Sequence, residues 1–275
     1  MKQITLISLC IGFALGMNAQ QSIMTFNIRY NNPKDGENWW EKRKADVGAL
    51  VNFYQPDVMG IQEGLHEQVA FLDDFLTQYD YVGVGRDDGK QKGEYAALFY
   101  NRDKLELLDT KTYWLSDTPD QVSIGWDAAM ERIVTYGKFK DKHTQKILHV
   151  FNCHYDHIGP LARENSSKLV IDLIKKMGVS NERVAVIGDL NSLPDSKPIQ
   201  VLTQELHDAF ETSEKSPYGP VGTFNSFKSM DNLEGRIDYI LVNNLTVKSY
   251  IAIDDKRKNG FFVVLTLNFF ANSFG

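Results

Sequence analysis

Residues 184–191 read VAVIGDLN, a run of apolar residues followed directly by polar ones. Four apolar residues, most of them β-branched, predict a buried strand, and Gly188 then allows the backbone to approach a neighbour closely. Asp189 and Asn191 follow two residues apart, and residues with this spacing in an extended segment point to the same side. A carboxylate and an amide therefore project together from the end of a central strand, where α/β proteins place ligand sites. The same residue types also close polar turns, so this stretch alone leaves both interpretations open.

The composition around this strand is that of a globular protein. The chain has 275 residues, of which 43% are hydrophobic and 24% charged, so it can bury a substantial core. Its net charge of −6 and pI of about 5.6 provide no overall basic field, which argues against a general nucleic-acid binder. No repeat, low-complexity tract or linker divides the sequence, so we expect one domain over residues 20–275.

Residues 1–19 differ from the rest of the chain. Lys2 is followed by an apolar run over residues 4–15 and then by small residues before Gln20. This order is typical of a secretory signal peptide, although a buried N-terminal helix is the alternative. The run is short for a membrane span. We therefore expect a signal peptide over 1–19, export to the periplasm or the extracellular space, and no stable membrane insertion. Cys153 would then be the remaining cysteine, which excludes an internal disulfide.

Strand-like and helix-like patterns alternate along the mature chain. Strands are predicted at 22–30, 58–63, 81–84, 96–100, 105–115, 132–140, 146–156, 184–187, 222–225, 235–242, 250–254 and 261–270, and helices at 39–54, 65–76, 161–177 and 198–206. The strands outnumber the helices, and the helices come singly between strands. This order predicts an α+β fold.

Polar side chains stand at or near the ends of several predicted strands. They are Asn27, Glu63, His154 with Asp156, Asp189 with Asn191, and Asp238. When such groups are crowded or dehydrated they cost free energy, unless a cation or hydrogen bonds compensate. Oxygen ligands from Asp, Glu and Asn suit magnesium, manganese or calcium, whereas zinc usually takes more His or Cys. The pattern predicts a metal site with room for phosphate oxygens and water.

Several ordered segments carry a resemblance to a known family. They are TFNIRY at 25–30, IQE at 61–63, NCHYDH at 152–157, GDLNS at 188–192 and GRIDYIL at 235–241, together with WLS at 114–116 and GWD at 125–127. The chain resembles the endonuclease/exonuclease/phosphatase superfamily of deoxyribonuclease-I-like metal-dependent phosphoesterases, and within it an exported bacterial branch. The resemblance implies a four-layer α/β/β/α sandwich of two packed mixed sheets with outer helices. It also implies hydrolysis of a phosphodiester or phosphomonoester by metal-activated water.

The resemblance also assigns roles to individual residues. Glu63 would hold a magnesium, manganese or calcium ion, and Asn27 would support the metal or the substrate. His154 would hydrogen-bond the phosphoryl oxygens as charge develops. Asp189 would orient or deprotonate the attacking water, with Asn191 beside it to position phosphate or metal.

Further candidates surround these residues. The resemblance implies that Asp238 orients its catalytic neighbours. Arg132 and Arg163 are candidates to bind the substrate phosphate, with a solvated ion pair as the alternative for each. Asp156 and His157 would either belong to the site or form the turn after their strand.

The sequence indicates a broad class of substrate. The acidic charge favours a small-molecule or lipid phosphate ester over nucleic acid, and we expect a monomer. Three functions stay open: an active phosphoesterase, a catalytically defective relative that keeps metal and phosphate binding, and a carbohydrate or protein binder. The last would use the loop that contains Trp114 and Trp126, which either forms a substrate rim or packs on the core.

One segment departs from the family pattern. The family closes with Ser-Asp-His before an apolar strand, which supplies an Asp on the metal side and a catalytic His. Here residues 259–267 read NGFFVVLTL and contain neither. The flanking sequence indicates that a short segment is missing between Phe262 and Val263, so the resemblance predicts impaired activity.

We expect a variant with Pro-Ser-Asp-His-Phe-Pro inserted between Phe262 and Val263 to be roughly 10²–10⁴-fold more active than the chain itself, which is the usual effect of a general acid or base. Rates on one phosphate ester at saturating magnesium test this, with circular dichroism to verify that both proteins fold. Equal rates would mean that another residue, His157 first, supplies the role.

Overall fold

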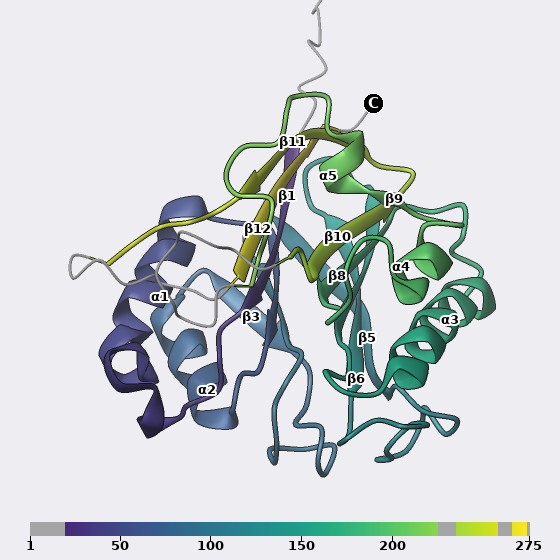
Figure 1. Cartoon of the computed structure of the whole chain (residues 1–275). Helices are drawn as coiled ribbons and strands as arrows, with labels where there is room; N and C mark the ends of the chain where they lie inside the picture. The colour runs from purple at the N-terminus through teal and green to yellow at the C-terminus, as the bar shows by residue number, and fades with distance from the viewer. Residues whose placement is uncertain (1–19, 225–234, 258–265, 274–275) are drawn as a thin grey trace, which may run out of the picture.

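The computed structural model describes residues 20–224, 235–257 and 266–273, with side chains for 21–224 and 235–257. The signal peptide predicted over 1–19 and the missing segment between Phe262 and Val263 fall outside these residues, as do residues 261–265 of the strand predicted at 261–270. The described part forms two packed sheets with helices on their outer faces (Figure 1).

The first sheet has six strands in the order β11-β12-β1-β2-β4-β3. Their bounds are β1 Gln20–Asn27, β2 Val58–Gln62, β3 Tyr79–Val82, β4 Leu98–Asn101, β11 Thr246–Ala252 and β12 Thr266–Ser273. Strands β1 and β2 run parallel, with Asn27 opposite Gln62, and the other pairs run antiparallel. The carboxyl ends of β1 and β2 therefore meet at one edge of the sheet.

The second sheet repeats this plan in the order β5-β6-β7-β8-β10-β9. Its strands are β5 Leu105–Trp114, β6 Ile133–Asp141, β7 Ile147–His154, β8 Val184–Asp189, β9 His207–Asp208 and β10 Asp238–Asn243. Strands β7 and β8 are parallel, with His154 opposite Asp189, while β10 runs antiparallel to β8 and places Asp238 opposite Asp189. Both sheets are mixed, as predicted.

Helices cover both outer faces of the pair of sheets. Helices α1 Trp40–Tyr54 and α2 His66–Phe75 pack on the first sheet, and α3 Pro160–Lys176 and α4 Lys197–Leu202 on the second (Figure 1). Two short elements complete the set, the 3-10 helix η1 Pro33–Asn38 and α5 Ala209–Thr212. This is the predicted four-layer α/β/β/α sandwich. Within the described ranges, no helix combines the length and the apolar character needed to cross a membrane.

Alternation along the strands explains which side chains lie between the sheets. In β1, Met24 and Phe26 pack under α1 and α2, whereas Ile23 belongs to the core between the sheets. In β8, Val184 and Val186 likewise face α3, and Ala185 and Ile187 face the first sheet. Since successive side chains point to opposite faces, Asn27 and Asp189 continue the rows that face the other sheet. The strand pattern therefore directs both polar ends into the space between the sheets.

A buried polar layer separates this apolar core from the strand ends. The Nε2 of Gln62 on β2 donates to Asn152 Oδ1 on β7 at 2.7 Å and to Thr25 Oγ1 on β1 at 3.1 Å. Asn152 Nδ2 donates in turn to the carbonyls of Ile61 and Ala97, both at 2.9 Å. A single side chain of the second sheet thus satisfies polar groups of the first.

Gly60 makes this contact possible. A Cβ atom at residue 60 would lie 2.6 Å from the Cγ and Oδ1 atoms of Asn152, and 2.7 Å from Cδ1 of Ile187. These distances are closer than side-chain carbons tolerate, so the absence of a side chain here sets the approach of the two sheets.

The structure corrects two predicted elements. Of the strand predicted at 222–225, the described residues 222–224 contain a single bridge residue, Phe224, and no continuous strand. The Thr223 N–H donates to the Gly235 carbonyl at 2.9 Å, and its hydroxyl donates to Asp238 at 2.7 Å. The helix predicted at 198–206 ends at Leu202, where a turn leads into the short strand β9, which was not predicted.

We expect Asn152→Ala to lower the free energy of unfolding by about 1–3 kcal/mol, because it removes three buried hydrogen bonds between the sheets. Urea denaturation measures this. Asn165→Ala, on the surface of α3, is the matched control and should change stability by less than about 0.5 kcal/mol. Equal stability of the two variants would contradict the role of the polar layer.

Candidate functional site

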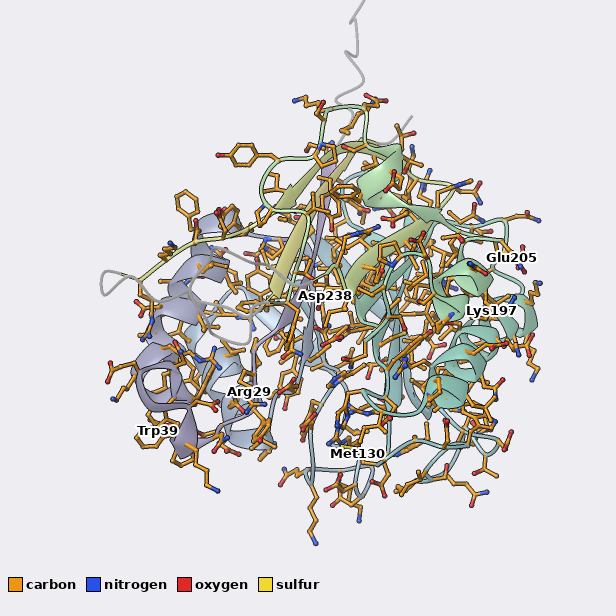
Figure 2. All side chains as sticks on the ribbon, in the orientation of Figure 1. Arg29, Trp39, Met130, Lys197, Glu205 and Asp238 are labelled. Carbon is orange, nitrogen blue, oxygen red and sulfur yellow. The ribbon has the colours of Figure 1, made fainter. Side chains whose placement is uncertain are left out.

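A cavity of about 470 Å³ lies at the strand ends. It is lined by Asn27, Arg29, Tyr30, Glu63, Arg86, Glu94, Met130, Arg132, His154, His157, Asp189, Asn191, Phe224 and Ile237. Figure 2 shows Arg29 and Met130 on different halves of the sandwich. The structure therefore brings together most of the residues predicted from the ends of β1, β2, β7 and β8.

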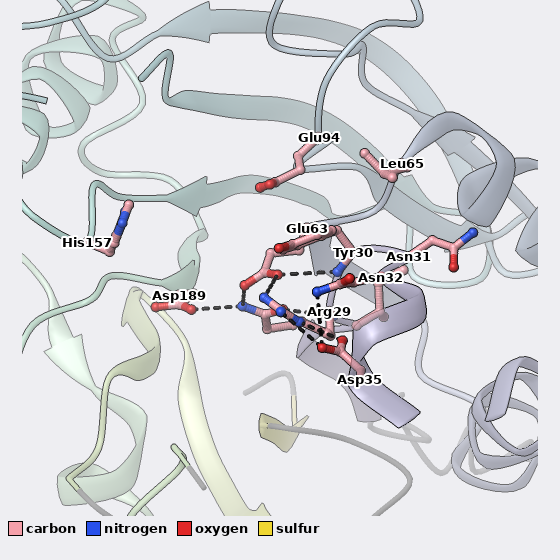
Figure 3. A network of polar contacts seen from close by, with 12 residues as sticks. Arg29, Tyr30, Asn31, Asn32, Asp35, Glu63, Leu65, Glu94, His157 and Asp189 are labelled. Carbon is pink, nitrogen blue, oxygen red and sulfur yellow. Dashed lines mark hydrogen bonds and ion pairs between the residues drawn. The ribbon is translucent and has the colours of Figure 1, made fainter. Parts of the chain in front are cut away.

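The amide of Asn27 connects the two carboxylates of the site. Its Nδ2 donates to Glu63 Oε1 and to Asp189 Oδ2, each at 2.9 Å, and its Oδ1 accepts the backbone N–H of Arg29 at 3.0 Å. Glu63 also accepts the Tyr30 N–H at 3.2 Å and lies 3.5 Å from Nη1 of Arg29 (Figure 3). In this arrangement Asn27 orients the carboxylates; its predicted contact with a metal or substrate stays a prediction.

Three of these residues have left-handed backbone conformations that non-glycine residues rarely adopt. The φ angles are 58° at Arg29, 60° at Glu63 and 46° at Asn191. Such strain persists where surrounding contacts determine the conformation, and it concentrates at functional sites. At Glu63 it also redirects the side chain, because strict alternation after β2 would turn it toward the outer face with Ile61.

Buried Arg43 on α1 holds the segment that follows β1. Its guanidinium donates to the carbonyls of Ile28, of Arg29 at 3.1 Å and of Asn38 at 2.8 Å. Burial lowers its pKa to about 10, so the group stays charged at neutral pH. Arg43 thereby fixes the backbone next to Glu63 without reaching the cavity.

Asp189 is buried and lies between groups of both signs. It accepts the Asn27 side chain and, through Oδ1, the backbone N–H of Asn191 at 3.0 Å. Burial raises its pKa to about 6 although these hydrogen bonds favour the charged form, and the nearby Glu63 carboxylate adds to the increase. The surrounding donors therefore do not fully compensate the negative charge of the Asp189 carboxylate.

Glu63, His154 and Asp189 form a set of possible metal ligands. One ligand atom from each lies within 4.8 Å of the others. Two carboxylates and an imidazole are ligands that bind divalent cations. A cation bound here would compensate the negative charge of Asp189. The residues present therefore fit such an ion. The imidazole was expected to bind phosphate, and the geometry adds a possible role as a ligand.

Arg132 lies beside His154 in the buried part of the site. Its Nη1 is 3.1 Å from Nε2 of His154, its Nη2 is 2.8 Å from Nδ1 of His157, and its Nε donates to Asp156 at 3.2 Å. Burial and the Arg132 charge lower the pKa of His154 well below its usual value, so this ring is neutral at pH 7. Arg132 Nη1 is also 3.3 Å from Nδ1 of His154, so either ring nitrogen can face the guanidinium. A neutral imidazole has one nitrogen that donates and one that accepts, and the accepting nitrogen is the one that can bind a metal ion.

The structure places three further residues that were predicted near the site. Asp156 is buried and accepts the backbone N–H groups of Ile158 and Gly159, which confirms the turn after its strand. It does not line the cavity, and its contact with a residue that does is the hydrogen bond from Arg132. Arg132 forms a buried ion pair with Asp156, and the solvated ion pair is wrong for it. His157 lines the cavity and is exposed (Figure 3).

Two predicted site residues do not line the cavity. Asp238 is fully buried below it, where it accepts the Thr223 hydroxyl at 2.7 Å. Arg163 lies on α3, donates to the Asp156 carbonyl at 3.1 Å and lines a neighbouring groove. A direct contact of either with a phosphate in the cavity is therefore not part of this geometry.

Sequence reasoning missed Arg86 and Glu94, which also line the cavity. Arg86 Nη1 donates to Glu94 Oε2 at 2.8 Å, and the same oxygen lies 3.7 Å from Nδ1 of His154. Burial raises the pKa of Glu94, while the Arg86 charge opposes the increase. Both residues come from the irregular segment between β3 and β4, where no periodicity indicates direction. The carboxylate before the predicted strand at 96–100 was the available signal.

The two tryptophans of the long loop do not line the cavity. Trp114 is buried and its Nε1 donates to the Arg86 carbonyl at 2.7 Å, which confirms the packing interpretation for this residue. Trp126 is half-buried and donates to Asp117 at 3.1 Å.

Comparisons with known proteins agree with this architecture. Residues 24–256 match the Endonuclease/Exonuclease/phosphatase family. An endonuclease/exonuclease/phosphatase from Bacteroides vulgatus is 37% identical with a TM-score of 0.87, over 94% of this chain and 100% of that one. A mannosyl-6-phosphatase from Bacteroides thetaiotaomicron VPI-5482 is 33% identical with a TM-score of 0.86, over 92% of this chain and 100% of that one.

A viral protein is also similar. The protein L388 of Acanthamoeba polyphaga mimivirus is 31% identical over 161 residues, which make up 56% of this chain and 59% of the viral protein. The match thus spans less than two thirds of the viral protein's own length.

We expect Asn27→Ala to lower the free energy of unfolding of the chelator-treated protein by about 1–3 kcal/mol, since two crowded carboxylates lose a shared donor. Asn27→Asp, which replaces the donor with a third carboxylate, should lower it further and should regain more on addition of Mg²⁺. Urea denaturation with and without the metal measures both. The same stability for wild type and both variants would show that the amide does not support the site.

Proposed function

Since the chain belongs to the endonuclease/exonuclease/phosphatase family, whose members are hydrolases that act on phosphate esters, we propose that it is a divalent-metal-dependent phosphatase of small phosphate monoesters. The observation that carries this proposal is the meeting of Glu63, Asp189 and His154 in one cavity with Arg132. A signal peptide over residues 1–19 remains part of the proposal and would place the enzyme outside the cytoplasm.

The metal is proposed to bind between the two carboxylates. Glu63 and Asp189 would hold the ion, with His154 within reach of the same position. An ion bound there would draw charge from the phosphoryl oxygens and lower the pKa of a bound water. Magnesium and manganese suit the oxygen-rich donors.

The protein's own groups would act on the substrate and on water. Asp189 is proposed to orient the attacking water and accept its proton, since both its oxygens keep lone pairs beside single hydrogen bonds from Asn27 and Asn191. The neutral His154 would donate to a phosphoryl oxygen. Arg132, which Asp156 holds in place, would add positive charge that needs no rearrangement during the reaction.

The similarity to a mannosyl-6-phosphatase supports a phosphate monoester as the substrate, and within this class a sugar phosphate. Arg29, Arg86 and Arg132 line the cavity and would attract the phosphoryl group. Because Arg29 also pairs with Asp35 and Arg132 with Asp156, the arginines by themselves favour neither a monoester nor a diester.

A second function, metal and phosphate binding without turnover, rests on the absent Ser-Asp-His segment. Binding of Mg²⁺ and inorganic phosphate together with no hydrolysis of any phosphate monoester would favour it over the phosphatase.

We expect phosphate release from mannose 6-phosphate to require Mg²⁺ or Mn²⁺ and to stop on addition of a chelator. Glu63→Gln should weaken metal binding by at least about 10–100-fold, because it removes a charged ligand. Calorimetric titration and a colorimetric phosphate assay measure the two effects.

Glu67→Gln is the matched control, because Glu67 is exposed at the start of α2 and does not line the cavity. Its metal affinity and rate should equal those of the wild type. Unchanged metal affinity in a folded Glu63→Gln protein would place the metal elsewhere.

A further inference from the structure

A groove of about 610 Å³ adjoins the cavity on the side of α3 and α4. This α3–α4 groove is lined by Pro160, Leu161, Arg163, Glu164, Asn191, Ser192, Leu193, Ser196, Lys197 and Pro198. Asn191 lines both the groove and the cavity, so the two spaces share this residue as part of their walls. The groove contains none of the proposed metal ligands.

Both walls of the groove are held by specific contacts. Asp127 caps the first turn of α3 by accepting the N–H groups of Leu161 at 3.2 Å and of Ala162 at 2.6 Å. On the opposite wall, Asn191 Nδ2 donates to the Tyr155 carbonyl at 3.0 Å, and Ser196 Oγ donates to the Leu193 carbonyl. The groove is therefore formed before any ligand binds, as is usual for small-molecule sites.

The lining mixes charged, polar and apolar groups. Within the described residues, neither Arg163 nor Lys197 forms an ion pair, and Arg163 makes one hydrogen bond to a carbonyl. Glu164 pairs with Lys168 at 2.7 Å and keeps a second oxygen. Leu161 and Leu193 are 51% and 55% exposed, unusually high for leucine side chains at the edge of a groove.

This mixture selects the chemistry of the ligand. An acyl chain would strip water from Arg163, Glu164 and Lys197 without replacing their hydrogen bonds. A second phosphate would meet the Glu164 carboxylate. Hydroxyl groups both donate and accept, so they can pair with the cations and with the carboxylate, while the C–H groups of a sugar ring contact the leucines.

We propose that the α3–α4 groove binds the polyhydroxylated alcohol part of the substrate, a sugar, while its phosphoryl group occupies the cavity. This inference rests on the proposed phosphatase function. The groove is then the specificity site, and Leu193 and Lys197 discriminate between sugar phosphates and simpler esters. Lys197 lies on the α4 side of the molecule, away from Arg29 (Figure 2).

Two substrates with the same kind of leaving group test the proposal. The full-length protein is assayed in Mg²⁺ with mannose 6-phosphate and with ethyl phosphate, which cannot fill the groove. We expect Leu193→Asp and Lys197→Ala each to lower kcat/KM for mannose 6-phosphate by about tenfold and to change that for ethyl phosphate by less than about twofold. Lys175→Ala, farther along α3 and exposed, should change neither value.

Equal losses for both esters, or no loss for either, would overturn the proposal. So would a larger effect of the variants on dodecyl phosphate than on the sugar phosphate, which would assign the groove to an acyl chain. If neither ester is hydrolysed, the proposed phosphatase function is wrong. Calorimetric titration with the two esters then tests separately whether the groove binds the sugar. Tighter binding of mannose 6-phosphate than of ethyl phosphate, lost in Leu193→Asp, would support it, and equal binding would overturn it.

Discussion

The close approach of two carboxylates from different sheets is the constraint on which the site depends. Glu63 and Asp189 lie at strand ends that are largely shielded from water, where like charges cost free energy unless donors or cations offset them. The Asn27 amide and the Arg29 guanidinium offset part of this cost, and Arg43 fixes the backbone that carries both. A bound divalent cation would offset the remainder, so metal binding and local stability are two aspects of the same electrostatic balance.

Much of this arrangement follows from the sequence because strand alternation is regular. Asn27, His154 and Asp189 continue rows that begin with apolar residues of the core between the sheets, and their positions at parallel strand ends bring them together. In the rows of Asn27 and His154, polar Thr25 and Asn152 come directly before the site residue. The sandwich itself was implied by the resemblance to the family, and the structure confirms it.

Other parts of the site have no periodic signal. Arg86 and Glu94 come from an irregular segment, and only the fold shows that it returns to the cavity. The reversed direction of Glu63 depends on a left-handed backbone conformation that no local pattern requires. Arg163 lies on the helix predicted at 161–177, as expected. The position of α3 in the fold, however, places Arg163 at the neighbouring groove and not at the cavity.

The lack of a side chain at Gly60 has a consequence for how this fold diverges. Because a Cβ atom there would collide with Asn152, the two positions cannot drift independently. Alanine at position 60 would require both Asn152 and Ile187 to move, or the sheets to separate, and either change disturbs the layer next to Asn27 and His154. An engineer who transplants this active site must therefore move residues 60, 152 and 187 together, although they are far apart in the sequence.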